Sequence, residues 1–291
     1  MQLEMFKDTV RSSRIDHPVN VASVPQRSPF RYPGGKTWLV PVVRRWLRQE
    51  VNKPELLIEP FAGGGIVSLT AIFENLAETA LMVEKDAEIA AVWDVIINRD
   101  YRSLAERIFA FEMNTVNAMR ELSRSTKAVE DTAFCTILKN RIFHGGILAK
   151  GSGLIKHGEN GKGISSRWYP KTLRDRIEAI GQIRGRIRFV RGDAFETLDA
   201  NREGTAAYYF IDPPYTAAGR RLYTHFAVDH EKLFDYVSRL KGRFMLTYDD
   251  ADEIRALAGH FGLSYRTIPM KTTHHLKKQE LIICDNFDWW D

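Results

Sequence analysis

The feature that most constrains the fold is a short apolar strand that runs into a glycine turn and continues as an apolar helix. Residues 56–61 (LLIEPF) predict the strand, residues 62–65 (AGGG) the turn, and residues 66–76 (IVSLTAIFENL) the helix. A second strand at 80–84 (ALMVE) and a helix at 87–97 (AEIAAVWDVII) follow at once. Strands joined by a crossover helix lie parallel in one sheet, so this segment predicts the first unit of an α/β fold.

Further apolar segments predict strands at residues 187–195, 206–215, 243–250 and 280–285. Helix-like stretches such as HEKLFDYVSRL and ADEIRALAGHFG separate them. This alternation predicts an α/β fold with a doubly wound, mainly parallel sheet of the Rossmann-like type.

The patterns divide the chain into three parts. Residues 1–27 predict a flexible arm. Residues 28–98 and 187–291 form the α/β domain, and residues 99–186 interrupt it as a subdomain of helices followed by a glycine-rich loop or hairpin. Within this subdomain, Asp131 is expected to cap a helix.

Composition limits the compartment and the partners. No apolar stretch approaches the roughly 20 residues of a membrane span, and the two cysteines, Cys135 and Cys284, lie in apolar runs typical of reduced, packed thiols. Both observations predict a cytoplasmic protein. The histidines lack the spacing of a structural zinc site, so we expect no metal. The net charge of +5 favours a polyanionic partner, and residues 144–174 carry six lysines and arginines against one acid.

Asp212, Pro213, Pro214 and Tyr215 form the most informative motif, because they follow the apolar strand residues 208–211. Ligands of such folds bind at the carboxyl ends of the strands. The exocyclic amine of a base is a poor nucleophile, since its lone pair is delocalised into the ring. A carboxylate and a backbone carbonyl that accept its two N–H bonds favour a pyramidal nitrogen, which frees the lone pair to attack a methyl sulfonium. Tyr215 offers a face on which a flipped base can stack.

The glycine turn predicts a cofactor other than a dinucleotide. Glu59, Phe61, Gly63 and Gly65 form it, and Ser68 stands where the third glycine of a dinucleotide fingerprint would fall. Glu59 would repel a pyrophosphate, whereas it suits a ligand that carries an ammonium and a sulfonium. S-adenosylmethionine therefore fits better than a nicotinamide dinucleotide. Only tight binding of a dinucleotide would support the alternative hypothesis of an oxidoreductase.

Three further groups complete the predicted cofactor site. Glycines and a lysine before the first strand resemble an anion cradle at a helix start: Tyr32, Pro33, Gly34, Gly35 and Lys36. Lys36 suits a carboxylate such as that of the cofactor's methionine end. Glu84 is placed to accept hydrogen bonds from ribose hydroxyls, and Asp193 to accept from the cofactor's adenine amino group. A solvated acid at a strand end is the competing interpretation of both.

Together these motifs resemble those of the Dam-type DNA adenine methyltransferases, in which the cofactor motifs precede the recognition region. The matching motifs, in order over residues 28–285, are FRYPGGK, IEPFAGGG, MVEKD, FVRGDAF, FIDPPY, TYDD and KKQELII. The resemblance implies the fold of S-adenosylmethionine-dependent methyltransferases, methylation of the 6-amino group of a flipped adenine, and a catalytic DPPY motif. It implies cofactor contacts at Tyr32, Lys36, Glu84 and Asp212.

Residues 140–170 look like the recognition hairpin of this family, so the resemblance implies double-stranded DNA as the partner. Their mixture of basic residues, glycines and apolar side chains also suits insertion into a groove and neutralisation of phosphates. The expected DNA-binding residues are Arg141, His144, Lys150, Lys156, Lys162 and Arg167.

Two positions depart from the family pattern. Tyr32 stands where members often have tryptophan, and Glu84 where many have aspartate, and both keep the ring and the carboxylate. The hairpin differs from that of the GATC-reading members, so their target sequence does not carry over, and a weakly specific enzyme also fits. We expect a monomer or weak dimer. A restriction nuclease is a possible partner that the sequence does not identify.

Two other functions fit part of the pattern. Methylation of another planar amine, on cytosine or on a protein glutamine, would suit the same fold, but those families more often carry serine or asparagine in place of Asp212. A catalytically silent DNA-binding protein would not need an intact cofactor pocket and DPPY motif. Measured cofactor binding would separate a silent protein from an enzyme.

Overall fold

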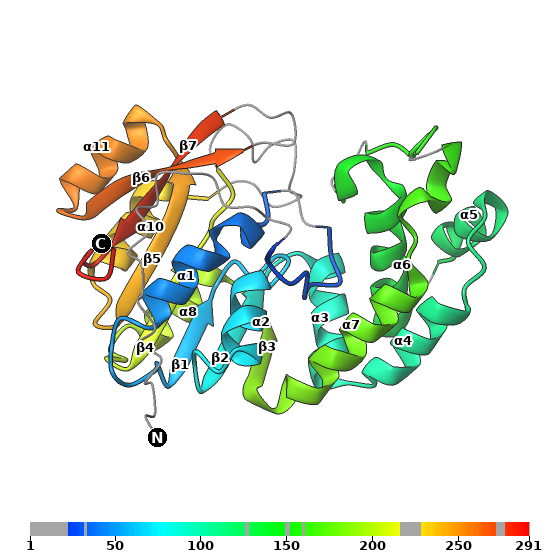
Figure 1. Ribbon diagram of the computed structural model, residues 1–291, viewed down its shortest axis with the longest axis horizontal. Helices are drawn as coiled ribbons and strands as arrows, with labels where there is room; N and C mark the ends of the chain where they lie inside the picture. The colour runs from blue at the N-terminus through cyan, green and yellow to red at the C-terminus, as the bar shows by residue number, and fades with distance from the viewer. Residues whose placement is uncertain are drawn as a thin grey trace, which may run out of the picture.

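A seven-stranded sheet in the order β3-β2-β1-β4-β5-β7-β6 forms the centre of the protein (Figure 1). The structure is a computed structural model, and it describes residues 23–31, 34–125, 128–148, 152–158, 161–215, 228–271 and 277–290. The strands are β1 (Leu56–Glu59), β2 (Thr79–Glu84), β3 (Ile187–Arg191), β4 (Ala207–Ile211), β5 (Arg243–Asp249), β6 (Ser264–Lys271) and β7 (Lys277–Cys284).

The five strands from β3 to β5 are parallel, and β7 runs antiparallel to both β5 and β6. This arrangement confirms the predicted doubly wound, mainly parallel sheet. The strand order reverses between β1 and β4, which are neighbours. Such a reversal leaves a crevice at the carboxyl ends of the two strands, where open α/β sheets bind ligands.

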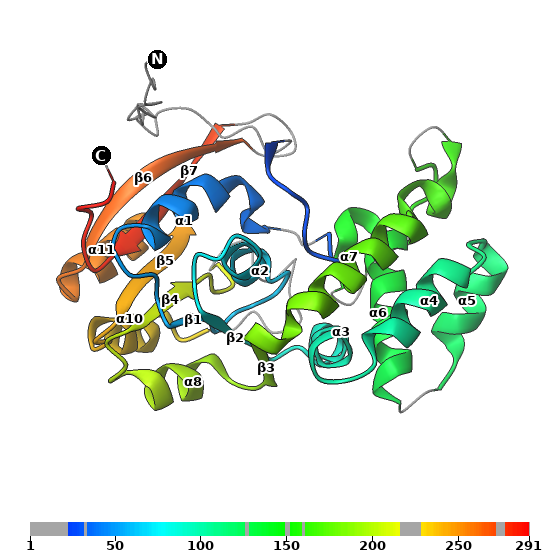
Figure 2. The same ribbon diagram turned by 60° about the horizontal axis from the view of Figure 1, so that its bottom comes forward.

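Helices cover both faces of the sheet (Figure 2). One face packs against α1 (Val40–Leu47), α2 (Ile66–Phe73) and α3 (Ala87–Asn98), and the other against α8 (Ala194–Asn201), α10 (His230–Ser238) and α11 (Asp252–His260). Side chains alternate along the strands, so that Leu57 joins the first core and Ile58 the second. Burial on both faces explains why the central strands are continuously apolar in sequence.

The packed part of the chain begins before the predicted boundary at residue 28. Val24 is 3% exposed, and Arg27 pairs with Glu74 at 3.1 Å. The 3-10 helix η2 (Lys36–Leu39) then leads into α1, so the segment after the glycines is helical as expected. Residues 1–22 of the predicted arm lie outside the described residues.

The segment predicted as a subdomain is mainly helical and lies beside the sheet (Figure 1). It contains α4 (Tyr101–Ala110), α5 (Thr115–Ser123), α6 (Val129–Ile142), η3 (His144–Gly146), η5 (Gly163–Arg167), α7 (Pro170–Ile183) and η6 (Arg184–Arg186). Its buried side chains continue the core that lies under α1, α2 and α3. The domain boundaries at 99 and 186 stay a prediction.

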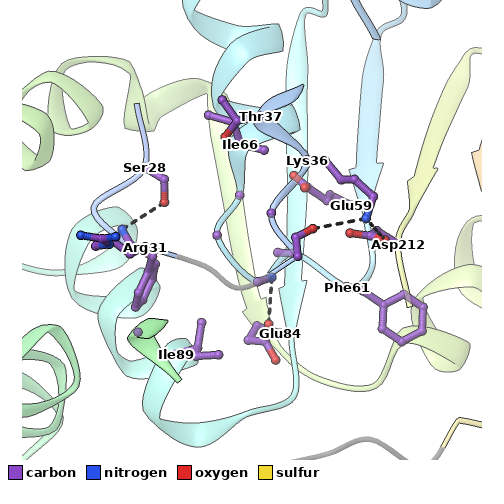
Figure 3. Close-up of a pocket in the computed structure, with 18 of the residues that line it drawn as sticks. Ser28, Arg31, Lys36, Thr37, Glu59, Phe61, Ile66, Glu84, Ile89 and Asp212 are labelled. Atoms are coloured by element: carbon purple, nitrogen blue, oxygen red, sulfur yellow. Dashed lines mark hydrogen bonds and ion pairs between the residues drawn. The ribbon is translucent and has the colours of Figure 1, made fainter. Parts of the chain in front are cut away.

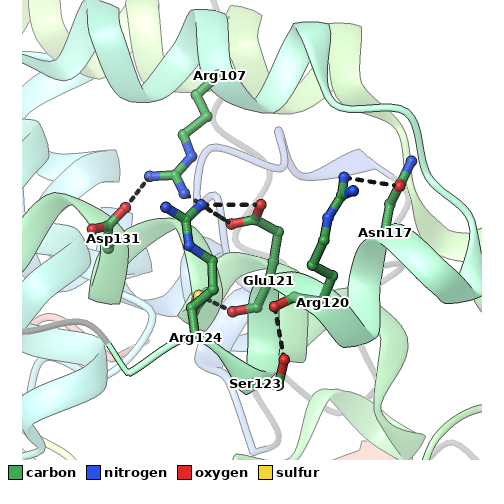
Figure 4. A network of polar contacts seen from close by, with 8 residues as sticks. Arg107, Asn117, Arg120, Glu121, Ser123, Arg124 and Asp131 are labelled. Carbon is green, nitrogen blue, oxygen red and sulfur yellow. Dashed lines mark hydrogen bonds and ion pairs between the residues drawn. The ribbon is translucent and has the colours of Figure 1, made fainter.

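An ion-pair network ties three of these helices together (Figure 4). Arg107 on α4 contacts Glu121 on α5 at 3.1 Å and Asp131 on α6 at 2.6 Å. The predicted cap at Asp131 is wrong, because the N-cap of α6 is Ala128 and Asp131 lies in the first turn. An acid there still suits the positive end of the helix dipole.

Strand β6 is absent from the sequence predictions. Most of its side chains are exposed, and it contains Pro269. Both features are typical of an edge strand, which needs no complete hydrogen-bond ladder and buries little apolar surface. The apolar pattern on which the other strand predictions depended is therefore weak here.

Candidate active site

A cavity of about 1090 Å³ opens beside the carboxyl ends of β1 and β4 (Figure 3). The sequence-predicted residues that line it are Gly34, Gly35, Lys36, Glu59, Phe61, Gly63, Gly65, Glu84, Arg141, Arg167, Asp193, Asp212 and Pro214. Tyr32, Pro33 and Lys150 lie outside the described residues. The fold thus brings together, from distant segments, residues that were expected to bind a cofactor, perform chemistry and contact DNA.

The glycine turn is held closely on both sides. The N–H of Gly63 donates to Glu84 Oε2 at 2.9 Å, and the indole N–H of Trp93 donates to the Gly63 carbonyl at 2.8 Å. Gly65 precedes α2 with a φ of 63°, and a Cβ there would come within 2.5 Å of Met82 Cε. Glycine adopts this backbone without strain and avoids the contact, so the turn packs closely against Met82 and Trp93.

Two carboxylates flank this turn. Glu59 is 3% exposed and accepts from Ser68 N at 2.9 Å, and burial raises its pKa to about 8. Glu84 accepts from the backbone N–H groups of Gly63 and Asp86, and burial raises its pKa to about 7. Since burial disfavours the charged form, both sites favour a ligand that brings positive charge or hydroxyl donors.

Lys36 and Asp212 meet at the centre of the cavity wall. Lys36 Nζ lies 2.9 Å from Asp212 Oδ1 and 3.7 Å from Glu280 Oε2, and the lysine is 3% exposed. Burial by itself lowers the pKa of Lys36, but the charges of Asp212 and Glu280 outweigh burial and raise that pKa. Thr247 Oγ1 also donates to Asp212 Oδ1, at 2.8 Å. Lys36 and Thr247 therefore share one oxygen of Asp212.

Tyr215 is not among the described residues that line the cavity, although its partner Glu280 is. Its ring stacks on that of Tyr248 at 5.8 Å, the Lys36 ammonium lies 4.8 Å from its centroid, and its hydroxyl donates to Glu280 Oε2 at 3.2 Å. Burial, with the charges of Asp212 and Glu280, raises the pKa of Tyr215 well above its usual value. Stacking of a base on Tyr215 stays a prediction, and it requires the ring to turn. Of the two prolines, Pro214 lines the cavity and Pro213 does not.

Asp193 lines the cavity at the start of α8. Its Oδ1 accepts from Phe195 N at 2.9 Å and caps the helix, while Oδ2 pairs with Lys85 at 2.9 Å. Burial raises the pKa of Asp193, but the charge of Lys85 and the hydrogen bonds from Lys85 and Phe195 together outweigh burial and lower that pKa. The carboxylate thus caps helix α8, and its contact with the cofactor adenine stays a prediction.

Four arginines line the same cavity: Arg31, Arg141 on α6, Arg167 in η5 and Arg176 on α7. Arg141 is 5% exposed and donates to the Pro29 carbonyl, and Arg176 donates to the Ser28 carbonyl at 3.0 Å. These two guanidinium groups thus donate to neutral carbonyl oxygens, which leave their positive charge unbalanced. Burial, with the charges of Arg176 and Arg31, lowers the pKa of Arg141 to about 9. Concentrated positive charge of this kind favours an anionic ligand.

The predicted recognition segment forms a short hairpin in its described part. His144 N donates to the Gly153 carbonyl at 3.0 Å, and Ile155 N to the Ile142 carbonyl at 2.9 Å. The predicted DNA-binding residues separate into two groups. His144, Lys156 and Lys162 are exposed, whereas Arg141 is buried and, with half-buried Arg167, lines the cavity.

Sequence reasoning missed several residues that line the cavity or support it: Glu280, Thr247, Trp93, Arg176, Phe195 and Ile89. Glu280 carried a usable signal, because it is a charged residue next to the apolar strand run LIIC. Thr247 and Phe195 stand in the TYDD and FVRGDAF motifs, whereas Trp93, Arg176 and Ile89 resemble ordinary core or surface positions that only the fold brings to the site.

Within the described residues, no group of three or more histidine, cysteine, aspartate or glutamate side chains could hold a metal ion. No described helix is both long and apolar enough to cross a membrane.

Part of the chain is similar to a known family of proteins. Residues 32–133 match the family of D12 class N6 adenine-specific DNA methyltransferases. No curated protein matches the chain at a significant level. Among solved structures, the rRNA methyltransferase aviRa from Streptomyces viridochromogenes is 11% identical with a TM-score of 0.41, and the match covers 94% of this chain and 96% of that one. The precorrin-6y C5,15-methyltransferase from Geobacter metallireducens is 12% identical with a TM-score of 0.37, covering 85% of this chain and 86% of that one.

The matched residues contain Gly34, Gly35 and Lys36, the glycine turn and Glu84, all of which line the cavity. The match confirms the family resemblance of the motifs over residues 32–133, and the chain is a methyltransferase.

Proposed function

We propose that the protein methylates DNA, moving a methyl group from S-adenosylmethionine to the exocyclic 6-amino group of an adenine turned out of the duplex. The observation that carries this proposal is one cavity lined by the Asp212 carboxylate, by the buried acids Glu59 and Glu84, and by four arginines. The acids suit a cationic cofactor, the arginines suit a polyanion, and Asp212 lies in the same cavity as both.

The acid-lined part of the cavity fits this cofactor. Burial raises the pKa of Glu59 to about 8 and that of Glu84 to about 7. A bound ammonium, sulfonium or ribose hydroxyl would offset the free-energy cost of keeping these carboxylates ionised inside the protein. Ile89 and Phe195 line the same cavity and offer apolar contact to an adenine ring. When bound, the cofactor supplies an electrophilic methyl group on a sulfonium.

Asp212 would activate the amine. Lys36 and Thr247 both contact its Oδ1, which leaves Oδ2 to accept one N–H of the amine while a neighbouring backbone carbonyl accepts the other. Pro213 has no N–H to compete for these acceptors, and the two prolines stiffen the turn. With the cofactor bound, the freed lone pair would form the nitrogen–carbon bond as the carbon–sulfur bond breaks. S-adenosylhomocysteine would leave, and the surplus proton of the amine would pass to solvent.

The positive wall supports a nucleic acid as the substrate. Arg141, Arg167 and Arg176 line the cavity from α6, η5 and α7, and the hairpin beside them exposes Lys156 and Lys162. A phosphate backbone is an anion well matched to several guanidinium groups, because each contact neutralises a phosphate and releases a counterion. A protein glutamine acceptor would make no use of this charge.

The test is to incubate the purified chain with methyl-labelled S-adenosylmethionine and unmethylated duplex DNA, digest the DNA, and identify the labelled nucleoside by mass. Label on the 6-amino group of adenine is the expected result, and sequencing of the modified sites then gives the target. Label on cytosine would overturn the base assignment. Cofactor binding without any label on DNA would overturn the DNA substrate.

A further inference from the structure

We propose that Glu280 is a positioning residue of the methyl-transfer site, which holds Lys36 and Tyr215 and thereby keeps Asp212 available to the substrate amine. The inference rests on the proposed function only for the identity of that amine. It adds a residue from the last strand of the sheet, outside the DPPY motif and outside the matched residues 32–133.

Glu280 occupies an unusual position for an acid. It lies on β7 opposite Asp249 of β5, it is 4% exposed, and it lines the cavity. A carboxylate buried without partners costs several kcal/mol, so its contacts must compensate for lost hydration. The next described residues toward the amino end of β7, Gln279 and Lys278, are exposed and offer a direct comparison.

The contacts of Glu280 join both ends of the DPPY turn. Its Oε2 accepts from the Tyr215 hydroxyl at 3.2 Å and lies 3.7 Å from Lys36 Nζ. Lys36 Nζ in turn lies 2.9 Å from Asp212 Oδ1. Glu280 therefore contacts Tyr215, the last residue of the turn, directly, and acts on Asp212, the first residue, through Lys36. Since a stiff turn with both ends held has few alternative positions, Glu280 restricts where the Asp212 carboxylate can lie.

The charges suggest a second effect. One buried ammonium is shared between Asp212 and Glu280, and neutralising Glu280 leaves Lys36 entirely to Asp212. A tighter Lys36–Asp212 pair lowers the electron density that Asp212 can offer to an N–H of the substrate. Ionised Glu280 therefore favours the reaction by drawing the lysine partly away.

The titration of Glu280 gives this effect a pH range. Burial raises its pKa to about 7, and the nearby charge of Lys36 opposes that rise. The groups that face it are Lys36 from η2, Asp212 and Tyr215 after β4, and Asp249 from β5. Burial also raises the pKa of Asp249. Glu280 is thus protonated below a pH of about 7 and ionised above it.

The central experiment compares Glu280→Gln with wild type, and uses Gln279→Ala, an exposed position on the same strand, as the matched control. At saturating cofactor and DNA, kcat of Glu280→Gln should fall about tenfold or more, the loss typical of a partner that orients a functional ligand, while KM for the cofactor changes little. Wild-type kcat should rise as pH increases through about 7, and Glu280→Gln should lose this rise. An unchanged kcat with an unchanged pH profile would overturn the proposal.

A stability measurement tests the same residue without any methyl transfer. Because the folded state raises the pKa of Glu280 above its unfolded value, the folded protein binds the extra proton and its stability falls as pH rises from about 4.5 to about 7. Glu280→Gln removes this loss, so its unfolding temperature relative to wild type should be higher at pH 8 than at pH 5. A difference that does not vary with pH would contradict the buried, ionising carboxylate on which the proposal depends.

Tyr215→Phe provides a second route, since it deletes one hydroxyl and keeps the ring. If Glu280→Gln does not fold, a fall in kcat of Tyr215→Phe alone tests whether the bond to Glu280 positions the turn. If Glu280 acts partly through this hydroxyl, the double variant should lose less activity than the product of the two single losses. Fully multiplicative losses would remove Tyr215 from the proposal. If wild type binds the cofactor but labels no DNA, the proposed function fails, whereas the pH-dependent stability difference still decides the burial and charge of Glu280.

Discussion

The ammonium of Lys36 lies 2.9 Å from Oδ1 of Asp212, so the helix start before β1 is joined directly to the turn after β4. Lys36 is 3% exposed, and a second acid, Glu280, lies 3.7 Å from it. The lysine therefore balances the charge of these two acids inside the protein.

Lys36→Met should destabilise the fold, because it leaves the buried Glu280 and the half-buried Asp212 without their cation. Breaking a buried pair from one side costs about 3–5 kcal/mol. Lys53→Met is the matched control, since its partner Glu78 is 56% exposed and such a pair contributes at most about 1 kcal/mol. Urea unfolding at pH 8, where Glu280 is ionised, measures both. Equal losses in the two variants would mean that the pair is not desolvated.

Asp212→Asn should abolish methyl transfer and keep DNA binding. The amide keeps the shape but loses the charge that draws on the amine, and the loss of one such electrostatic contact lowers kcat by about a hundredfold or more. Asp199→Asn, at an exposed acid on α8, should leave kcat unchanged. Labelled-methyl turnover and a DNA-binding titration report the two properties separately. Near-normal turnover in Asp212→Asn would remove Asp212 from the chemistry.

Gly65→Ala should weaken cofactor binding and lower stability, because the left-handed backbone and the contact with Met82 Cε both disfavour a Cβ. Such strain costs of order 1–3 kcal/mol. Gly259→Ala is the control, since a Cβ added there would meet no atom within 4 Å and the position is helical, where alanine is favoured. Calorimetric titration of S-adenosylmethionine and thermal unfolding check the pair. Tight cofactor binding by Gly65→Ala would show that the turn does not approach the ligand.

Cofactor affinity should increase as pH rises through about 7, because burial raises the pKa of Glu84 to that value and the ionised form is the better acceptor for hydroxyl donors. Glu84→Gln should bind more weakly and lose this part of the pH dependence. Titrations between pH 5.5 and 8.5 compare the two proteins, with the range set by the Glu84 pKa of about 7. A wild-type affinity that is flat over this range would argue against contact between Glu84 and the cofactor.

Replacing Lys156 and Lys162 by alanine should weaken DNA binding and reduce its salt dependence. If both side chains contact phosphates, the slope of log K against log salt falls in magnitude by about 2, since each contact contributes about 0.9. Lys241 and Arg202 are the control pair, because they lie near the amino-terminal ends of β4 and β5, away from the cavity. An unchanged slope in the Lys156 and Lys162 variant would move the DNA-binding surface elsewhere.

Much of the sheet could be predicted from the sequence because the local patterns and the global fold agree. The central strands are buried on both faces and therefore continuously apolar, and the glycine turn marks the crossover between β1 and α2. Strand β6 was missed because an exposed edge strand with a proline carries no such pattern. The cap at Asp131 was misplaced because helix ends depend on backbone geometry more than on residue type.

The sequence by itself determined the fold class, the family and the motif residues, because each is encoded in short contiguous segments whose order is preserved along the chain. Only the tertiary structure decided which side chains share the site. Glu280 on β7 meets Lys36 and Tyr215, and Arg176 on α7 lines the same cavity as Asp212. These relationships arise because parallel strands place their carboxyl ends at one edge and the antiparallel β7 returns past them, so that the partners come from distant segments.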